Sequence, residues 1–217
     1  MTALSKRFTR SWEGPRKESL YSRFKRILIP PEALKSRILR AVQCLRGQME
    51  RLEQIENQLL RRDKELFTSA THAYTNHDTA RATMYANELS EIRGLTRIVM
   101  QSHLALEQIV LRLETVELLG DVVVTLAPAT TVLKTVSDDM GWVIPEAEKE
   151  FENVSELLDG MLVEAGLRKG EAFDFRSASE NAKRILEEAS KLAEERIKER
   201  LPELPPALLA AHEKVTA

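Results

Sequence analysis

The residues that could do catalytic chemistry are present, but no pattern that catalysis uses brings them together. The four histidines show neither His-Glu-x-x-His spacing nor neighbouring cysteine pairs; they are His72, His77, His103 and His212. The sequence also holds no Gly-rich phosphate loop. Acidic pairs such as Glu187-Glu188 are typical of a helix surface, without an enclosed cleft to shift their pKa. We therefore predict that the chain is not an enzyme and binds no cofactor or metal.

The N-terminus carries residues suited to binding an anionic surface. Residues 1–40 hold 11 Lys and Arg against 3 Asp and Glu, whereas residues 141–217 hold 11 against 17. Three apolar residues spaced by four share one face of a short helix, and basic residues occupy its other faces; the set is Leu4, Phe8 and Trp12 with Lys6, Arg7 and Arg10. This composition is typical of a helix that lies in a membrane interface.

Two other interpretations of this basic leader remain open. The first is structural: a disordered basic tail, or a segment that packs on the protein itself. The second is another class of protein, a coiled-coil adaptor or a nucleic-acid-binding helical protein that uses the basic N-terminus. Apolar residues at helical spacing, rather than base-stacking aromatics in a groove, favour lipid. We therefore expect no nucleic-acid partner.

A second binding motif follows the last predicted helix. Leu201-Pro202-Glu203-Leu204-Pro205-Pro206 alternates leucine and proline. Proline presets an extended backbone, which lowers the entropy cost of docking into an apolar groove of a partner. A simple helix stop followed by a disordered end is the alternative.

The elements that must position these motifs are long helices. Aromatic residues make up only 5% of the 217 residues and charged residues 30%, a composition typical of long helices. From Glu32 to Val124 there is no proline, and the one polar break, Thr75-Asn76-His77-Asp78, predicts a hairpin of helices from Pro31 to about Tyr74 and from near Thr79. Asn76 or Asp78 is the expected cap of the second helix.

Apolar residues repeat every seven positions in both arms of this hairpin. They predict a coiled-coil-like seam of Leu45, Leu52, Leu59, Leu66, Ile92, Val99, Leu106 and Leu113. Glu56 and Asp63 interrupt a second, weaker stripe, and Asp63 is expected among the charges of the outer face. The stripe of the second arm is wider than one partner needs, which predicts more than one neighbouring helix.

Shorter helices are predicted after the hairpin, at Ala129–Met140, from Pro145 to about Ala165, and from Ser177 or Ser179 to Leu201-Pro202. Gly166 and Gly170 mark a flexible link. The predicted organisation is a basic leader (1–30), an all-α core (31–166) with its hairpin at 31–124, a linker with an acidic regulatory helix (167–201), and a proline-rich tail (202–217). The single cysteine, Cys44, excludes an internal disulfide and fits a reducing cytosol.

The order of these features resembles the ESCRT-III superfamily, in particular the archaeal cell-division proteins of the CdvB type. The resemblance covers roughly residues 1–206 and includes the leader, the hairpin with its small-residue tip, and the acidic helices. Residues Leu201, Pro202, Leu204, Pro205 and Pro206 look like the family's proline-rich motif, which docks on the MIT domain of a Vps-type AAA ATPase (CdvC).

The resemblance implies a filament subunit that polymerises with itself and with paralogous ESCRT-III subunits on membrane necks. The ATPase would remodel the polymer during constriction and scission in archaeal cell division, and vesicle budding would use the same surfaces. The implied location is cytoplasmic, on the inner face of the cell membrane at the division site. In the closed form the acidic last helix would lie against the hairpin.

One departure from the family pattern concerns the C-terminus. Only 11 residues follow Pro206, too few for the winged-helix segment with which some CdvB paralogues recruit CdvA. We expect a paralogue without that segment, recruited by other ESCRT-III subunits, although a truncated sequence would look the same. The bacterial phage-shock coat proteins share the hairpin but usually lack the proline-rich motif, so residues 201–206 argue against them.

Overall fold

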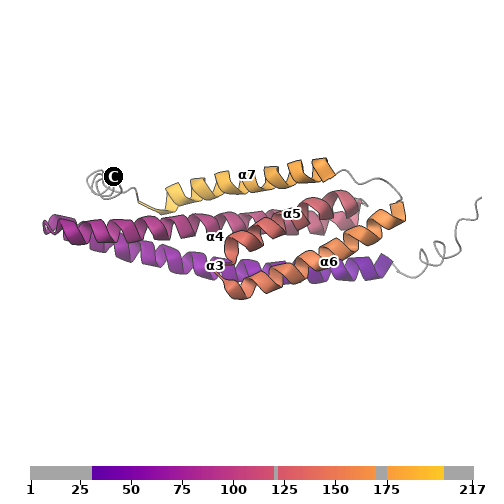
Figure 1. Ribbon diagram of the computed structural model, residues 1–217, viewed down its shortest axis with the longest axis horizontal. Helices are drawn as coiled ribbons and strands as arrows, with labels where there is room; N and C mark the ends of the chain where they lie inside the picture. Colours follow the sequence, from indigo (N-terminus) through magenta and orange to yellow (C-terminus); the bar gives the residue numbers. More distant parts are fainter. Residues whose placement is uncertain (1–30, 120–121, 170–174, 203–217) are drawn as a thin grey trace, which may run out of the picture. The chain divides into compact units, whose positions relative to one another are not determined.

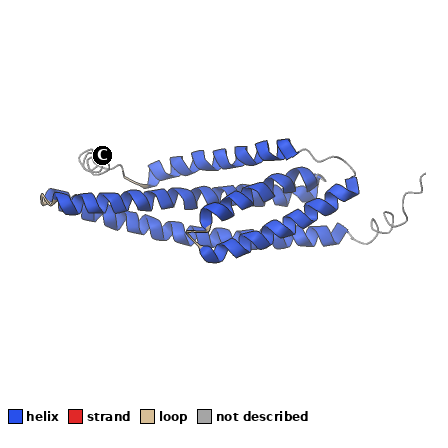
Figure 2. Ribbon diagram, viewed as in Figure 1, coloured by secondary structure: helices blue, strands red, loops and turns tan. Residues whose placement is uncertain are grey.

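The computed structural model describes residues 31–119, 122–169 and 175–202. They form five helices, α3 (Pro31–Thr75), α4 (Thr79–Leu119), α5 (Val122–Met140), α6 (Pro145–Lys169) and α7 (Phe175–Arg200) (Figure 1). Helices and short turns account for all the described residues, without a strand among them (Figure 2). The predicted all-α, ESCRT-III-like fold class is confirmed.

The turn between α3 and α4 is built from local hydrogen bonds. The amide of Asp78 donates to the carbonyl of Ala73 (3.0 Å) and the amide of His77 donates to that of Tyr74 (3.0 Å), the pattern of a Schellman motif. His77 has a positive φ of 60°, at the position where glycine is usual. The Asp78 carboxylate then accepts a hydrogen bond from the amide of Arg81 (3.1 Å), so Asp78 caps α4 as one of the two predicted candidates.

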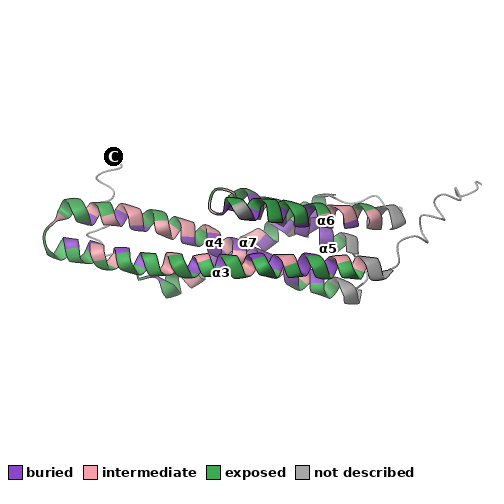
Figure 3. Cartoon of the chain, turned by 90° about the horizontal axis from the view of Figure 1, so that it is seen from below, coloured by how far each residue is buried: buried purple, intermediate pink, exposed green. Residues whose placement is uncertain are grey.

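Charged pairs align the two arms of the hairpin. Arg46 pairs with Glu114 near its open end, and Arg62 pairs with Glu88 (2.6 Å) near the tip. These pairings place the arms antiparallel, with apolar positions between them. Buried residues face neighbouring helices and exposed residues face outward, as Figure 3 shows.

Helix α4 has the several neighbours that its wide stripe predicted. It packs closely against α5 and α7 and pairs with α3 through the charged side chains above. Consistent with this, consecutive residues such as Leu104, Ala105 and Leu106 are all buried. The prediction of more than one neighbouring helix is confirmed.

Helix α5 differs from its prediction at the N-terminus. The hairpin was expected to run to Val124 and the next helix to begin at Ala129, but α4 ends at Leu119 and α5 begins at Val122. Pro128 therefore lies inside α5, where it removes the hydrogen bond to the carbonyl of Val124. Val124 is 57% exposed in the first turn, where water can replace that bond.

Helix α6 lies against both α5 and α3. Its buried side chains are large and include Phe151, Val154, Leu158 and Met161. Arg37 of α3 pairs with Glu164 of α6 (2.8 Å), a contact from near the start of the first long helix. α6 runs past the expected Ala165 to Lys169, so Gly166 lies within the helix instead of the linker, and Gly170 lies outside the described residues.

Helix α7 packs along α4 and α5 (Figure 1). It begins at Phe175, two residues before the earlier of the two predicted starts, and ends as predicted before Leu201. Its buried stripe follows helical spacing and consists of Ala178, Ala182, Ile185, Ala189 and Ala193. Four of these five residues are alanine, so α7 approaches its neighbours with little side-chain bulk between them.

Candidate functional site

The end of α7 meets the hairpin at a polar contact in an otherwise apolar interface. Two acidic residues of α3, Glu56 and Asp63, are buried here, with 5% and 0% of their side chains exposed. Arg200 of α7 approaches Glu56, and Arg93 of α4 approaches Asp63. Arg93 also contacts the carbonyl of Pro202, just after the end of α7. We call this set, made of Glu56, Asp63, Arg93, His103, Arg200 and the Pro202 carbonyl, the terminal contact.

Glu56 connects all three helices of the terminal contact. Arg200 of α7 donates to its Oε1 at 2.6 Å, and His103 Nδ1 of α4 lies 3.8 Å from its Oε2, longer than a hydrogen bond. That Nδ1 is buried and makes no hydrogen bond among the described residues. The neighbouring imidazole of His103, followed by the cations Arg200 and Arg196, lowers the pKa of Glu56 below its ordinary value and outweighs the effect of burial.

Asp63 is held by an arginine that also reaches the end of α7. Arg93 Nε donates to Asp63 Oδ1 at 2.7 Å, and Arg93 Nη2 donates to the backbone carbonyl of Pro202 at 2.9 Å. Leu201, between α7 and that carbonyl, is buried. The expectation that Asp63 belongs to the outer charged face is wrong, because the closing arms enclose it with Arg93.

The chemistry of the terminal contact favours one alignment of α7. A buried carboxylate without a partner is costly, so Glu56 is stable only where cations reach it. Sliding α7 by one turn would carry Arg200 away from Glu56 and Pro202 away from Arg93. The apolar stripe of α7 supplies attraction, and the terminal contact fixes the register.

The residues predicted from sequence fall into three groups. Of the seam residues, Leu59 and Ile92 are half-buried and the other six are buried: Leu45, Leu52, Leu66, Val99, Leu106 and Leu113. Of the proline-rich motif, Leu201 is buried and the Pro202 carbonyl lies in the terminal contact, whereas Leu204, Pro205 and Pro206 lie outside the described residues. So do all six leader residues, Leu4, Lys6, Arg7, Phe8, Arg10 and Trp12.

Other reactive groups form no second site in the part of the chain that the structure describes. Within it, His, Cys, Asp and Glu side chains do not gather in groups of three that could hold a metal ion. Cys44 Sγ lies 3.7 Å from a carboxylate oxygen of Glu150, and burial followed by this negative charge raises the pKa of the thiol. No described helix is long and apolar enough to cross a membrane.

Sequence reasoning missed Arg93 and Arg200 as functional residues. Arg93 is 30 positions from Asp63, and Arg200 is 144 positions from Glu56. The available signal was the pair of acidic residues seven positions apart within an apolar stripe, because buried carboxylates require cationic partners. That signal predicts partners but not which of the 32 Lys and Arg they are.

A long helical hairpin covered by a short C-terminal helix defines the class of fold, and known proteins identify the family. The chain is 37% identical to Cell division protein B1 of Sulfolobus acidocaldarius over 216 residues, which are 99% of this chain and 97% of that protein. It is 35% identical to Cell division protein B of the same organism over 161 residues, 74% of this chain and 62% of that protein.

The chain therefore belongs to the CdvB-type family of ESCRT-III proteins. No family model matches it, and no solved structure matches it with significance.

Proposed function

We propose that this protein is an ESCRT-III filament subunit of archaeal cell division, captured here in a closed conformation. It polymerises on membrane necks, drives their constriction and scission, and is remodelled by an AAA ATPase. The observation that carries the proposal is the docking of α7 on the hairpin through small side chains and the terminal contact. The relatives named as cell division proteins support the process it serves.

The small side chains in the α7 interface support the proposal that α7 can detach from the hairpin. A buried Ala contributes about one methyl group, near 0.8 kcal/mol, whereas a buried Leu, Phe or Met contributes about 1.5–3 kcal/mol. Four of the five stripe residues of α7 are alanine. When α7 detaches, apolar side chains of α4 and α5 and the carboxylate of Glu56 become exposed. In a filament, the hairpins of neighbouring subunits cover this exposed surface.

Assembly is tested with purified protein and vesicles under the electron microscope. Ala189→Glu places a charge in the fully buried stripe of α7 and should lower the protein concentration at which filaments coat anionic vesicles. The matched control is Glu188→Ala, next to it on the exposed side. Absence of polymers for the parent and both variants, with and without vesicles, would refute the filament proposal.

Membrane contact is assigned to the leader residues Leu4, Phe8 and Trp12 with Lys6, Arg7 and Arg10. Phe8→Ala combined with Trp12→Ala should reduce co-sedimentation with anionic vesicles at least several-fold. Equal vesicle binding by this variant would remove the role from these residues. Steep, salt-dependent binding to nucleic acid without vesicle binding would favour the nucleic-acid alternative.

ATPase recruitment is assigned to Leu201, Pro202, Leu204, Pro205 and Pro206. Leu204→Ala and Pro205→Ala should each weaken binding of an isolated MIT domain of the CdvC-type ATPase in calorimetry. Ala207→Ser is the matched control just beyond the motif. Unchanged affinity for both motif variants would contradict the assignment.

A further inference from the structure

The turn between α5 and α6 displays a tryptophan on a firm support. Trp142 is 61% exposed and stands between the buried Met140 and Ile144. The amides of Val143 and Ile144 both donate to the carbonyl of Met140, at 2.9 and 2.8 Å. The indole is therefore held at the surface by a hydrogen-bonded turn with a buried residue on each side. Tryptophan is one of the residues that contribute most to protein interfaces, because a single ring buries a large apolar area.

Acidic side chains surround this tryptophan. Asp138 and Asp139 are exposed in the last turn of α5, where the helix dipole favours cations. The carboxylate of Glu148 lies beside Gly141, since a Cβ placed on that glycine would be 3.7 Å from Glu148 Oε2. Partial burial, followed by the charge of Asp138, raises the pKa of Asp139, and no cation among the described residues offsets these effects. The turn therefore fits a partner surface that brings positive charge to an aromatic ring.

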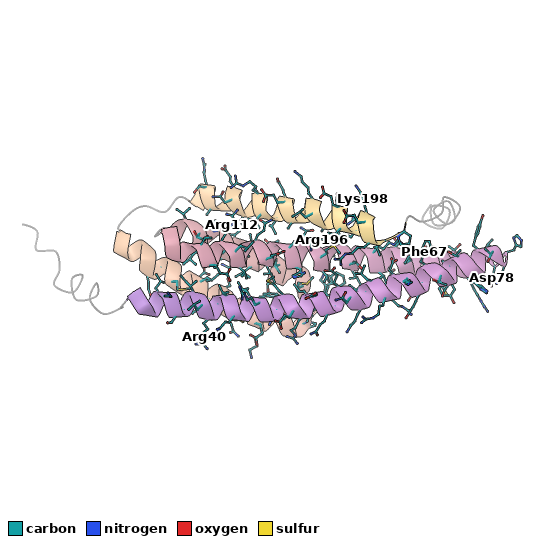
Figure 4. All side chains as sticks on the ribbon, turned by 180° about the vertical axis from the view of Figure 1, so that it is seen from behind. Arg40, Phe67, Asp78, Arg112, Arg196 and Lys198 are labelled. Carbon is teal, nitrogen blue, oxygen red and sulfur yellow. The ribbon has the colours of Figure 1, made fainter. Side chains whose placement is uncertain are left out.

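The outer face of α3 has an open position of the opposite charge. Gly47 lies in the interior of α3, and a Cβ added there would meet nothing within 4 Å. Exposed Arg40 and Arg51 lie within about 40° of Gly47 around the helix axis, and Glu50 lies about 60° away on the other side. Figure 4 shows Arg40 on the side of α3 that faces away from α4 and α7. Glycine is unfavourable inside a helix, and the packing of the subunit itself does not require it here.

A second exposed glycine shows which feature distinguishes Gly47. A Cβ added to Gly94 of α4 would also meet nothing within 4 Å. Its exposed neighbours one turn away, Glu91 and Arg97, carry opposite charges. Gly94 therefore offers the same space without the positive charge, and only Gly47 of these two matches the acidic surroundings of Trp142.

We propose that Trp142 of one copy of this chain packs over Gly47 of a second copy, with Arg40 and Arg51 of the second copy facing the carboxylates around the indole. Arginine stacks on indole rings and pairs with carboxylates, so the same two side chains serve both parts of the contact. The inference rests on the proposed function, because a filament subunit must contact copies of itself. Each copy carries both surfaces, so the contact can be repeated from one copy to the next.

Filling the open position tests the contact in solution, without vesicles. Sedimentation velocity of the parent should show reversible association as protein concentration rises. Gly47→Leu should require at least a tenfold higher concentration, whereas the matched control Gly94→Leu should associate as the parent does. With Trp12→Phe in each protein, Trp142 is the one remaining tryptophan, and its emission should shift to shorter wavelength on association. A parent that stays monomeric, or equal association of parent and Gly47→Leu, would overturn the inference.

Exchanging the charges tests whether the two surfaces meet each other. Asp138→Lys combined with Asp139→Lys should abolish association at the parent's concentration, and so should Arg40→Glu combined with Arg51→Glu. An equal mixture of the two double variants should associate again, because each supplies the charge that the other now needs. All four positions are exposed, and circular dichroism confirms that the variants fold. A mixture that stays monomeric would contradict the pairing of these surfaces.

Electron microscopy with anionic vesicles separates this inference from the proposed function. Gly47→Leu and Trp142→Ala should each raise several-fold the protein concentration at which filaments coat the vesicles, and Gly94→Leu should not. Filaments of both variants at the parent's concentration would refute the contact and leave the filament proposal standing. Association in solution that requires Gly47 and Trp142, without filaments of the parent on vesicles, would refute the filament proposal alone.

Discussion

Helices α6 and α7 have nearly the same length, 25 and 26 residues, but they pack with different side chains. α6 buries Phe151, Val154, Leu158 and Met161, whereas α7 buries four alanines and Ile185. Because each large side chain contributes about two to four times as much as a methyl group, α6 belongs to the permanent core and α7 is held more weakly. The weaker apolar packing of α7 is supplemented by the polar contacts at its C-terminal end, which fix its position along the hairpin.

The largest expected effect is on the free energy of unfolding and comes from a substitution in α6. Phe151→Ala removes a fully buried ring of α6 and should lower the free energy of unfolding by about 3–5 kcal/mol in urea denaturation. Val163→Ala, at a 61% exposed position on the same helix, is the control and should cost less than about 0.5 kcal/mol. A loss below about 1 kcal/mol for Phe151→Ala would show that α6 is not part of the permanent core.

On α7, overpacking should act locally. Ala189→Leu adds bulk where α7 approaches its neighbours closely and should destabilise its docking by about 1–3 kcal/mol. Hydrogen exchange should rise along α7 while amides of α5 and α6 keep their protection. Leu192→Ala, 42% exposed on the same helix, should leave exchange unchanged. Equal acceleration in α6 would mean that the two helices unfold as one unit.

Removing the cation of the terminal contact should have a smaller effect. Arg200→Gln leaves Glu56 with His103 and Arg196 nearby, and Arg200 is 47% exposed, so docking should weaken by about 1 kcal/mol. Hydrogen exchange at the end of α7 measures this. Lys198→Gln removes the same charge at an exposed position of the same turn and serves as the control. An equal effect of the two variants would show that the loss comes from net charge and not from the Arg200–Glu56 contact.

The smallest expected effect is a pH dependence of the same contact. The folded pKa of Glu56 is lowered, so its contribution to stability is complete above the unfolded value of about 4.3 and is lost as pH falls through the folded pKa. His103 of α4 and Arg196 and Arg200 of α7 face this carboxylate. Thermal unfolding between pH 3 and 6 should show a shallower acid decline in Glu56→Gln than in the parent. Parallel dependence of thermal stability on pH in the parent and in Glu56→Gln would show that Glu56 does not contribute to the acid decline.

Sequence predicted best the features that depend on neighbouring residues. The turn at 75–78 and the cap at Asp78 follow from short-range hydrogen bonding, and the ends of α3 and α7 agree with their predictions within a residue. The start of α5 was missed because Pro128 is normally a boundary signal, and the structure accommodates it inside the helix.

Features that depend on distant residues were not predictable in the same way. Asp63 was expected on the surface because an acidic residue in a charged stretch is usually solvated, and its burial depends on Arg93 in the opposite arm. The position of Pro202 on Arg93 likewise depends on how α7 lies along α4. Heptad spacing marks which positions face a neighbour, but it does not identify the neighbour.

The alanine stripe of α7 also bears on solubility. An undocked α7 would expose the methyl groups of this stripe and Ile185, together with the half-buried Leu186 and Ile197, which is less apolar surface than a helix with a stripe of large side chains would expose. Its remaining residues are mostly Glu, Lys and Arg, and the pairs Glu187 with Lys191 and Glu194 with Lys198 stand four apart in the order that supports a solitary helix. Each such pair adds about 0.2–0.5 kcal/mol to an isolated helix, so these pairs favour the helical form of α7 when it is away from the hairpin.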